Sequence, residues 1–210
     1  MAHQGPRYSR SAPGRCQRRA AQETSMETKA PLRKATVCRS KEIHRGRVFT
    51  LLQETVSLPN GVTAQLELIR HPGAAAVVPL LDDSTVIMIK QYRHAVGTAI
   101  WEIPAGTLCP DEEPLECAKR ECAEETGYEP GALQKLAEIV PVPGYSDERI
   151  HMFLARDLRK APRSLDEDEI IAVRPLALAS ALGMIRRGEI QDAKTIIGLM
   201  LAKASLMGAP

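Results

Sequence analysis

Aromatic side chains are scarce in this chain of 210 residues, at 3% of the total, whereas apolar residues make up 44%. The core must therefore rest on Leu, Ile, Val and Ala, and one domain with an appended segment is expected at this length. Long apolar runs are also missing. None approaches the roughly 18 residues of a membrane-spanning helix, so we expect no membrane partner.

Paired cysteines are lacking as well. The five cysteines are odd in number and include no CxxC pair, and they are Cys16, Cys38, Cys109, Cys117 and Cys122. Neither a disulfide framework nor a zinc site is therefore indicated. This usage is typical of a reducing compartment, and we expect a cytoplasmic protein.

Charge is divided unevenly along the chain. Residues 1–48 hold twelve Lys or Arg against three Asp or Glu, which leaves 16 basic and 23 acidic residues beyond them. Residues 1–35 are rich in Arg, Ser, Pro and Ala without apolar periodicity, and we interpret them as a disordered leader. An organellar targeting peptide and a nucleic-acid-binding arm are the alternatives. We expect no nucleic-acid partner, because no reading motif or interleaved aromatic pattern accompanies the charge.

The strongest pattern lies between Gly106 and Tyr128. Pro114 suits the first turn of a helix and Gly127 suits the left-handed position after a helix end, so one short helix is expected between them. Glycines and charged residues occur in and around this helix at fixed spacings: Gly106, Glu112, Arg120, Glu121, Glu124, Glu125 and Gly127.

The expected helix has an apolar side and an acidic side. Leu115, Ala118 and Cys122 recur at spacings of three and four, which makes a stripe that should dock the helix on a core. Residues 111–129 hold eight acidic and two basic side chains. Like charges this close destabilise a helix and raise the pKa of one another. A hard divalent cation such as Mg²⁺, with Mn²⁺ as a substitute, reverses that penalty because it takes carboxylate and phosphate oxygens as ligands.

This pattern resembles the Nudix box, and every fixed position of that box is filled here. The resemblance implies four metal ligands, three of them carboxylates and one a backbone carbonyl, from Glu121, Glu125, Glu124 and Ala105. It also implies that Glu112 holds Arg120. The box therefore indicates a metal-dependent hydrolase that acts on a phosphorylated substrate.

Apolar runs predict the remaining elements. Asn60-Gly61 separates two runs within residues 48–71 and is typical of a hairpin. Strands are also expected at 74–81, 85–92, 99–103, 136–142, 150–155 and 170–174, and helices at 176–187 and 192–206. This order indicates an α+β protein, in which helices flank a mixed sheet as in the α/β/α sandwich of the Nudix fold. We expect residues 36–71 to form a small N-terminal β unit and residues 72–207 to form the Nudix domain.

Segments outside the box resemble those of ADP-ribose pyrophosphatases. They are residues 90–94 with 101–106, 143–148 and 187–195. Pro143, fifteen residues beyond Tyr128, matches the proline by which that subfamily is recognised. The resemblance implies hydrolysis of ADP-ribose to AMP and ribose 5-phosphate. It also implies a homodimer, in which the N-terminal β unit crosses to the partner and helps to build both sites.

Two roles in the reaction fall to residues outside the box. Glu148 is the candidate general base, because a Pro-Gly loop carries it where it could face the metals. In the alternatives, Glu148 only ligates metal or Glu124 activates the water. Arg93 is the candidate phosphate or ribose contact, since a guanidinium grips a phosphate with two hydrogen bonds, and Arg70 is a second candidate.

Four further residues are weighed as substrate contacts. Glu102 either accepts hydrogen bonds from the substrate or forms a structural salt bridge. Trp101 is expected in the core rather than as a platform for a base. Tyr145 and Phe49 are candidate adenine contacts.

Two alternatives to ADP-ribose hydrolysis stay open. One is hydrolysis of GDP-mannose or another nucleoside diphosphosugar, because the box fixes the chemistry and leaves the substrate to other residues. The other is a regulator that binds ADP-ribose without cleaving it. The complete set of box carboxylates argues against a regulator.

Overall fold

The computed structural model describes residues 34–208. The leader expected at residues 1–35 therefore lies, apart from its last two residues, outside the described part of the chain. Within the described part, no helix is both long enough and apolar enough to cross a membrane.

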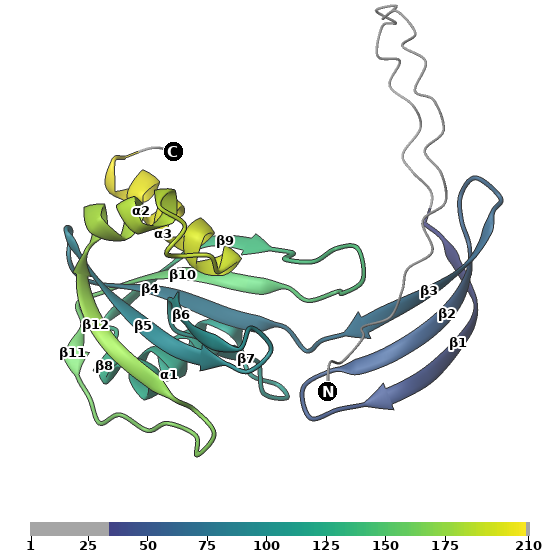
Figure 1. The fold of residues 1–210 in the computed structure, drawn as a ribbon, viewed down its shortest axis with the longest axis horizontal. Helices are drawn as coiled ribbons and strands as arrows, with labels where there is room; N and C mark the ends of the chain where they lie inside the picture. Colours follow the sequence, from purple (N-terminus) through teal and green to yellow (C-terminus); the bar gives the residue numbers. More distant parts are fainter. Residues whose placement is uncertain (1–33, 209–210) are drawn as a thin grey trace, which may run out of the picture. The chain divides into compact units, whose positions relative to one another are not determined.

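Three antiparallel strands form a small sheet at the start of the described chain (Figure 1). They are β1 (Thr36–Arg45), β2 (Thr50–Ser57) and β3 (Thr63–Arg70), with β2 in the centre. The expected hairpin is confirmed, because β2 and β3 pair along their whole lengths and Gly61 lies in the turn with a φ of 82°. Sequence analysis does not predict β1, since its exposed and charged residues do not alternate with apolar ones.

A larger mixed sheet follows. Its strands are β4 (Ala74–Asp82), β5 (Thr85–Arg93), β6 (Thr98–Glu102), β7 (Ala105–Thr107), β9 (Ala132–Ile139), β10 (Ile150–Arg156) and β12 (Ile171–Ala177). The order is β12-β5-β4-β10-β9, with β6 paired to β5 and β7 paired to β4. β10 runs parallel to β4 and antiparallel to β9, so the sheet is mixed as expected. Two short strands, β8 (Tyr128–Glu129) and β11 (Arg159–Lys160), form a separate pair.

Strands β4 and β5 begin as a hairpin and then separate. They pair only beside the turn, at Leu80↔Val86 and Asp82↔Thr85. Farther along, β6 pairs with β5 and β7 pairs with β4, and the N–H of Val77 donates to the carbonyl of Pro104 at 2.9 Å. The backbone at the start of the box is therefore fixed between the two central strands.

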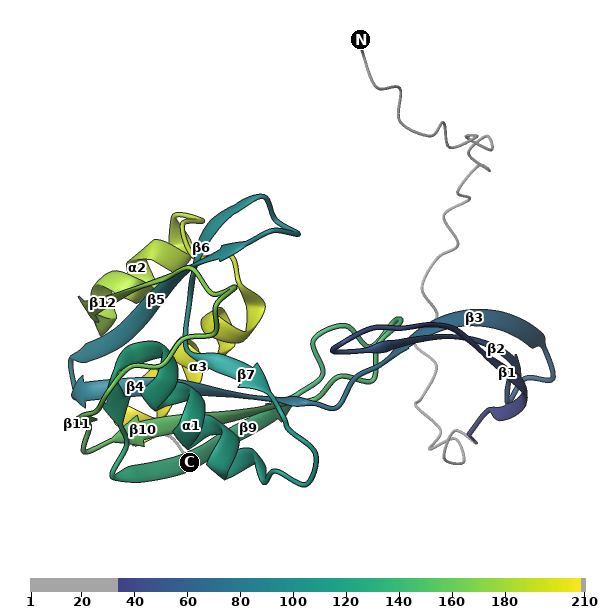
Figure 2. The same ribbon diagram turned by 90° about the horizontal axis from the view of Figure 1, so that it is seen from below.

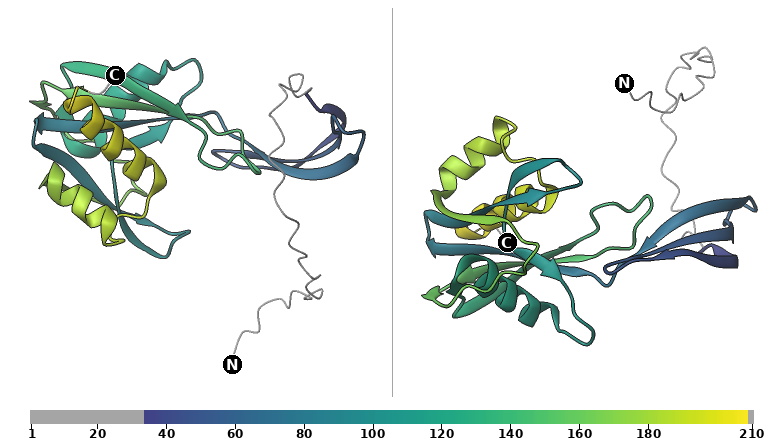
Figure 3. Two further views of the ribbon diagram at one scale, coloured as in Figure 1. Left: turned by 90° about the horizontal axis from the view of Figure 1, so that it is seen from above. Right: turned by 60° about the horizontal axis from the view of Figure 1, so that its bottom comes forward.

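Helices cover both faces of this sheet (Figures 2 and 3). They are α1 (Pro114–Thr126), α2 (Leu178–Arg186) and α3 (Ala193–Leu206). Ala76 and Val78 of β4 pack in the core cluster that contains residues of α2 and α3, whereas Ala75 and Val77 pack with α1. Because successive residues of a strand point to opposite faces, one apolar strand serves both layers. The expected α/β/α sandwich is confirmed.

The docking stripe predicted for α1 is wrong at one position. Ala118 and Cys122 are fully buried as expected, but Leu115 is 43% exposed and the third buried contact is Cys117. Leu115 points in nearly the same direction as Cys122, yet it lies in the first turn of the helix. Packing on the sheet therefore begins one turn later than the spacing suggests.

The strand predicted at residues 136–142 is shifted. It runs instead as β9 from Ala132 to Ile139, where it pairs with β10. Pro141 and Pro143 lack the N–H that a strand ladder requires, so the strand ends before them.

We expect Gly127→Ala to lower the free energy of unfolding by about 1 kcal/mol. Gly127 closes α1 in the left-handed conformation, at a φ of 76°, and its N–H donates to the carbonyl of Ala123. The strain is conformational, because a Cβ there would meet other atoms only at ordinary contact distances. Urea unfolding monitored by circular dichroism measures the change. Gly144→Ala is the control, since a Cβ there enters open space, and an equal effect in both variants would contradict the prediction.

Candidate active site

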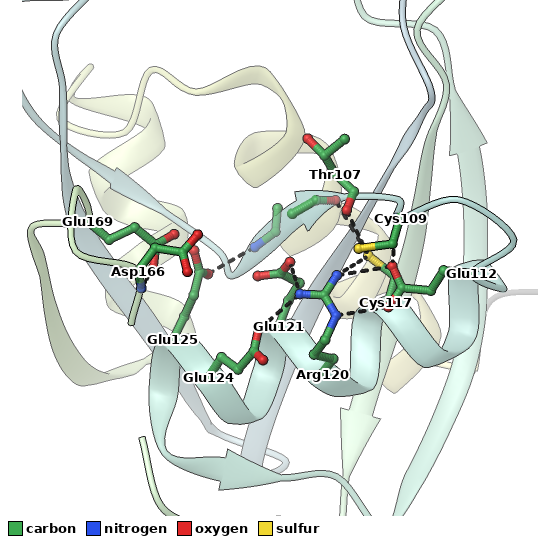
Figure 4. A network of polar contacts seen from close by, with 12 residues as sticks. Thr107, Cys109, Glu112, Cys117, Arg120, Glu121, Glu124, Glu125, Asp166 and Glu169 are labelled. Atoms are coloured by element: carbon green, nitrogen blue, oxygen red, sulfur yellow. Dashed lines mark hydrogen bonds and ion pairs between the residues drawn. The ribbon is translucent and has the colours of Figure 1, made fainter. Parts of the chain in front are cut away.

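Arg120 lies at the centre of a carboxylate cluster on α1 (Figure 4). Its Nε and Nη2 donate to the two oxygens of Glu112, at 2.8 and 3.1 Å. Its Nη1 donates to Glu121 Oε1 at 2.6 Å and to Glu124 Oε2 at 2.9 Å. Glu112 also accepts from the N–H of Cys109 at 2.9 Å. The hydrogen bond from Arg120 is the main reason that the pKa of Glu112 falls to about 2.

The backbone of β7 lies directly against these carboxylates. A Cβ on Gly106 would stand 1.8 Å from Glu121 Oε1, so a larger residue at this position would require the Glu121 carboxylate to move. One residue earlier, the N–H of Ala105 donates to Glu125 Oε2 at 3.0 Å. Strand β7 and helix α1 therefore meet through two glutamates as well as through Cys117, whose Sγ lies 3.6 Å from the carbonyl of Gly106.

Glu125 and Glu121 are buried, at 1% and 8% exposure. Burial, followed by the nearby charge of Glu121, raises the pKa of Glu125 to about 8. Burial also raises the pKa of Glu121, although the charge of Arg120 opposes the change. Ionising a carboxyl group with such a raised pKa is unfavourable, and a nearby cation compensates for the negative charge that forms.

The donor set suits a hard divalent cation, but its side chains are turned toward Arg120. Among the described residues, no three carboxylate, imidazole or thiol side chains converge closely enough to hold a metal ion. Glu121 and Glu124 each accept a hydrogen bond from the Arg120 guanidinium, and their oxygens do not point at a common centre. Carboxylate oxygens in a buried acidic pocket are nevertheless the ligands that Mg²⁺ prefers. A cation could bind after these side chains exchange Arg120 for the metal.

A second charged cluster lies where β5 and β6 end and α3 begins. Arg93 Nε and Nη2 donate to both oxygens of Glu102, at 2.7 and 2.9 Å, and Lys194 forms a short hydrogen bond to the same carboxylate. Burial alone would raise the pKa of Glu102, but the hydrogen bonds and charges of Arg93 and Lys194 hold it below its usual range. Of the two roles weighed for Glu102, the structure contains the salt bridge. That bridge orients Arg93, which lines two adjoining cavities.

The NUDIX domain family model matches residues 70–197. This chain belongs to the Nudix family. An ADP-ribose pyrophosphatase of Bacillus subtilis (strain 168) is 43% identical over 157 residues, which cover 74% of this chain and 85% of that protein. A methanol dehydrogenase activator of Bacillus methanolicus is 40% identical, over 77% of this chain and 88% of that protein. A solved structure, described as an ADP compounds hydrolase, matches with a TM-score of 0.75 and 25% identity, over 85% of this chain and 97% of the other.

Of the Nudix carboxylates, Glu112, Glu121 and Glu124 line the larger of the two cavities, whereas Glu125 lines neither. The walls of the larger cavity come from β5, from β7 with the loop that leads to α1, from α1 itself and from residues 164–170. Glu148 lines the smaller cavity instead, together with Lys194 and Asp192, and the two cavities share Arg93 and the three residues of β7. Glu148 and the acidic cluster therefore face different cavities that meet at β7.

The other residues weighed as substrate contacts lie outside both cavities. Arg70 is paired with Glu54 and Asp147, each at 3.1 Å. Tyr145 is 54% exposed, and its carbonyl accepts from the N–H of Ile69 at the end of β3. Phe49 is 41% exposed.

Trp101 packs against the main core of the Nudix domain, with Lys90 Nζ 5.5 Å from the centre of its ring. The expectation of a core residue is confirmed.

Sequence analysis missed an acidic segment that the Nudix fold brings to the cluster. Glu169 lines the larger cavity, and its charge raises the pKa of both Glu121 and Glu125. Figure 4 places Glu169 and Asp166 beside Glu125. The segment is fastened to α1, because Arg163 Nε donates to the Glu125 carbonyl at 2.7 Å. The run of acidic residues at 166–169 was a visible signal, but nothing local connects it with the box.

We expect the metal-free Nudix domain to lose stability as the pH rises from about 5 to about 8. The folded pKa of Glu125 lies above the unfolded value, so the folded state binds more protons in this range, and the stability is lost as the pH passes the folded pKa. The slope from this group is at most ~1.4 kcal/mol per pH unit. Glu125→Gln should reduce the slope of the free energy of unfolding against pH.

Urea unfolding in EDTA across this pH range measures the effect. Glu129→Gln is the control, because Glu129 is an exposed carboxylate just beyond the same helix. Equal slopes for the parent and Glu125→Gln would contradict the buried, proton-binding state of Glu125.

Proposed function

We propose that this chain hydrolyses the diphosphate bond of ADP-ribose and releases AMP and ribose 5-phosphate. The observation that carries the proposal is the buried carboxylate cluster of α1, which opens into a cavity of ≈ 1410 Å³ that Arg93 also lines. A nucleoside diphosphosugar needs a site of this order of size. The name of the relative that is 43% identical supports ADP-ribose among such substrates.

We assign the cation to Glu121, Glu124 and Glu125 with the carbonyl of Ala105. Mg²⁺, or Mn²⁺ in its place, would supply positive charge for the phosphate oxygens and lower the pKa of bound water. The protein supplies a cluster of acidic groups whose repulsion favours any bound cation. Arg120 and Glu112 hold the loop between β7 and α1 in place.

Arg93 is the proposed phosphate contact. Glu102 holds its Nε and Nη2, so the guanidinium has a fixed orientation before substrate binds. Preorganised positive charge of this kind stabilises the negative charge that develops on the phosphates during attack by water. Lys194, which shares Glu102, keeps the carboxylate from cancelling that charge.

We assign the general base to Glu169, which would take a proton from the attacking water. Glu169 lines the cavity that contains the acidic cluster, and the N–H of Asp166 holds its carboxylate at 3.1 Å. Glu148 is the base expected from the sequence, with Glu124 as its alternative. Glu124 is engaged with Arg120, and Glu148 faces the smaller cavity.

The homodimer remains part of the proposal. Its support is the N-terminal sheet, where β1 is exposed along its whole length and Val37 and Ile43 are 50% and 45% exposed. Apolar side chains on an open strand edge favour contact with a second chain. Sedimentation equilibrium that returns a monomer at micromolar concentration would contradict it.

The substrate assignment is tested by turnover with Mg²⁺ across a panel of nucleotides. We expect kcat/KM for ADP-ribose to exceed that for GDP-mannose, ATP and dinucleoside polyphosphates by at least about tenfold, which is a difference of ~1.4 kcal/mol. Release of nucleoside monophosphate is quantified by chromatography. Faster release of nucleoside monophosphate from GDP-mannose would make GDP-mannose the substrate in place of ADP-ribose. Binding of ADP-ribose without turnover would favour a regulator.

The base assignment is tested by single substitutions. We expect Glu169→Gln to lower kcat by about 10² to 10⁴ with little change in KM, because a general base acts in the transition state. Glu148→Gln should retain most of its activity. Glu167→Gln is the matched control, since Glu167 is an exposed carboxylate on the same segment. A larger loss of kcat in Glu148→Gln than in Glu169→Gln would reverse the assignment.

A further inference from the structure

A buried amide on β5 lacks a hydrogen-bond partner. Gln91 is 5% exposed, and its Oε1 is buried without a hydrogen bond to any atom of residues 34–208. Buried polar groups are almost always paired, because an unpaired one destabilises the folded state. A glutamine kept in this condition calls for an explanation other than packing.

The amide faces the acidic cluster. Val86 and Met88 of β5 pack in the core cluster that contains residues of α2 and α3. Since side chains alternate along a strand, Gln91 and Arg93 point to the opposite face, which α1 covers. The charge of Arg93, two residues from Gln91, interacts with that of Glu125.

Two hydrogen bonds fix the distance between this part of β5 and α1. Gln91 is directly opposite Ile171 in the register of β5 and β12. The guanidinium of Arg163 connects the carbonyl of Ile171, at 2.9 Å, with the carbonyl of Glu125, at 2.7 Å. Gln91 also lines the larger cavity together with Glu121 and Glu124.

Among residues 34–208, no donor is placed on Gln91 Oε1, and the arginines that line this cavity are largely engaged with carboxylates. Arg120 uses all three of its nitrogens on carboxylates, and Arg93 uses Nε and Nη2 on Glu102. Ionised carboxylates such as Glu121 and Glu124 only accept. A molecule or ion that binds in the cavity can therefore bring the missing donor for the amide oxygen.

We infer that Gln91 Oε1 accepts a hydrogen bond from a water molecule carried by the divalent cation. The inference rests on the proposed function, because the same carboxylates would hold that cation. Mg²⁺ keeps several waters when it binds to a few carboxylates, and those waters are strong donors. Residues that hydrogen-bond to the groups bound to a metal orient the metal site, so Gln91 is a positioning residue for the reaction.

Gln91→Met tests the inference, because methionine has a similar size and no amide. We expect the dissociation constant for Mn²⁺ alone, measured without substrate from the electron paramagnetic resonance signal of free Mn²⁺, to rise about tenfold. In EDTA, the melting temperature should rise by about 2–5 °C because an unpaired buried group is removed. Gln134→Met is the control, since it makes the same change at an exposed position on β9. It should change neither quantity.

Weaker Mn²⁺ binding together with a higher melting temperature distinguishes this role from a structural one. A lower melting temperature with unchanged Mn²⁺ affinity would make Gln91 a packing residue, and unchanged affinity with weaker ADP-ribose binding would make it a substrate contact. Either result would overturn the inference. Gln91→Glu, which keeps an oxygen acceptor, should retain Mn²⁺ affinity, and a tenfold loss there would also contradict us. A parent protein that binds no Mn²⁺ would refute the proposed function itself.

Discussion

The close approach of the β7 backbone to two buried glutamates is the constraint on which the rest of the structure depends. Gly106 leaves no room for a Cβ against Glu121, and the N–H of Ala105 is tied to Glu125. To hold this contact, β4 and β5 must separate and admit β7 between them. The helix must also dock through small side chains, and Cys117 and Ala118 have no exposed surface.

Such a contact places negative charge where a protein core would ordinarily be apolar. Burying an unpaired carboxylate is strongly unfavourable, and a cation must compensate for it. In the metal-free protein Arg120 supplies that cation, with Glu112 as its fixed anchor. The same arrangement explains why the acidic side chains point at a guanidinium instead of at a common metal centre. Arg120 thus offsets the charge of carboxylates that a metal can also recruit.

At the ends of β5 and β6, Glu102 applies the same principle with the charges reversed. One almost fully buried carboxylate holds Arg93 and Lys194 side by side. Two positive groups are therefore fixed at the wall of the smaller cavity, and Arg93 also lines the larger cavity with the acidic groups of α1. A diphosphate needs both kinds of neighbour, because its oxygens require positive charge and its cation requires negative charge.

Local chemistry made much of this predictable. Helix α1 begins at Pro114 and ends before Gly127 because both signals act within a few residues, and the central strands follow from continuous apolar runs. Leu115 was misplaced because helical spacing gives the direction of a side chain and not the length of the surface beneath it. β1 was missed because an exposed strand needs no apolar alternation.

The sequence by itself determined the family, the sandwich of helices and strands, and the acidic residues of the box. Only the tertiary structure decided which distant groups join them. Glu169 and Gln91 reach the box through strand register and the hydrogen bonds of Arg163, whereas Glu148 faces the smaller cavity. The physical reason is that caps and periodicity act between near neighbours in the chain, while a polar site is assembled by contacts whose partners no local pattern specifies.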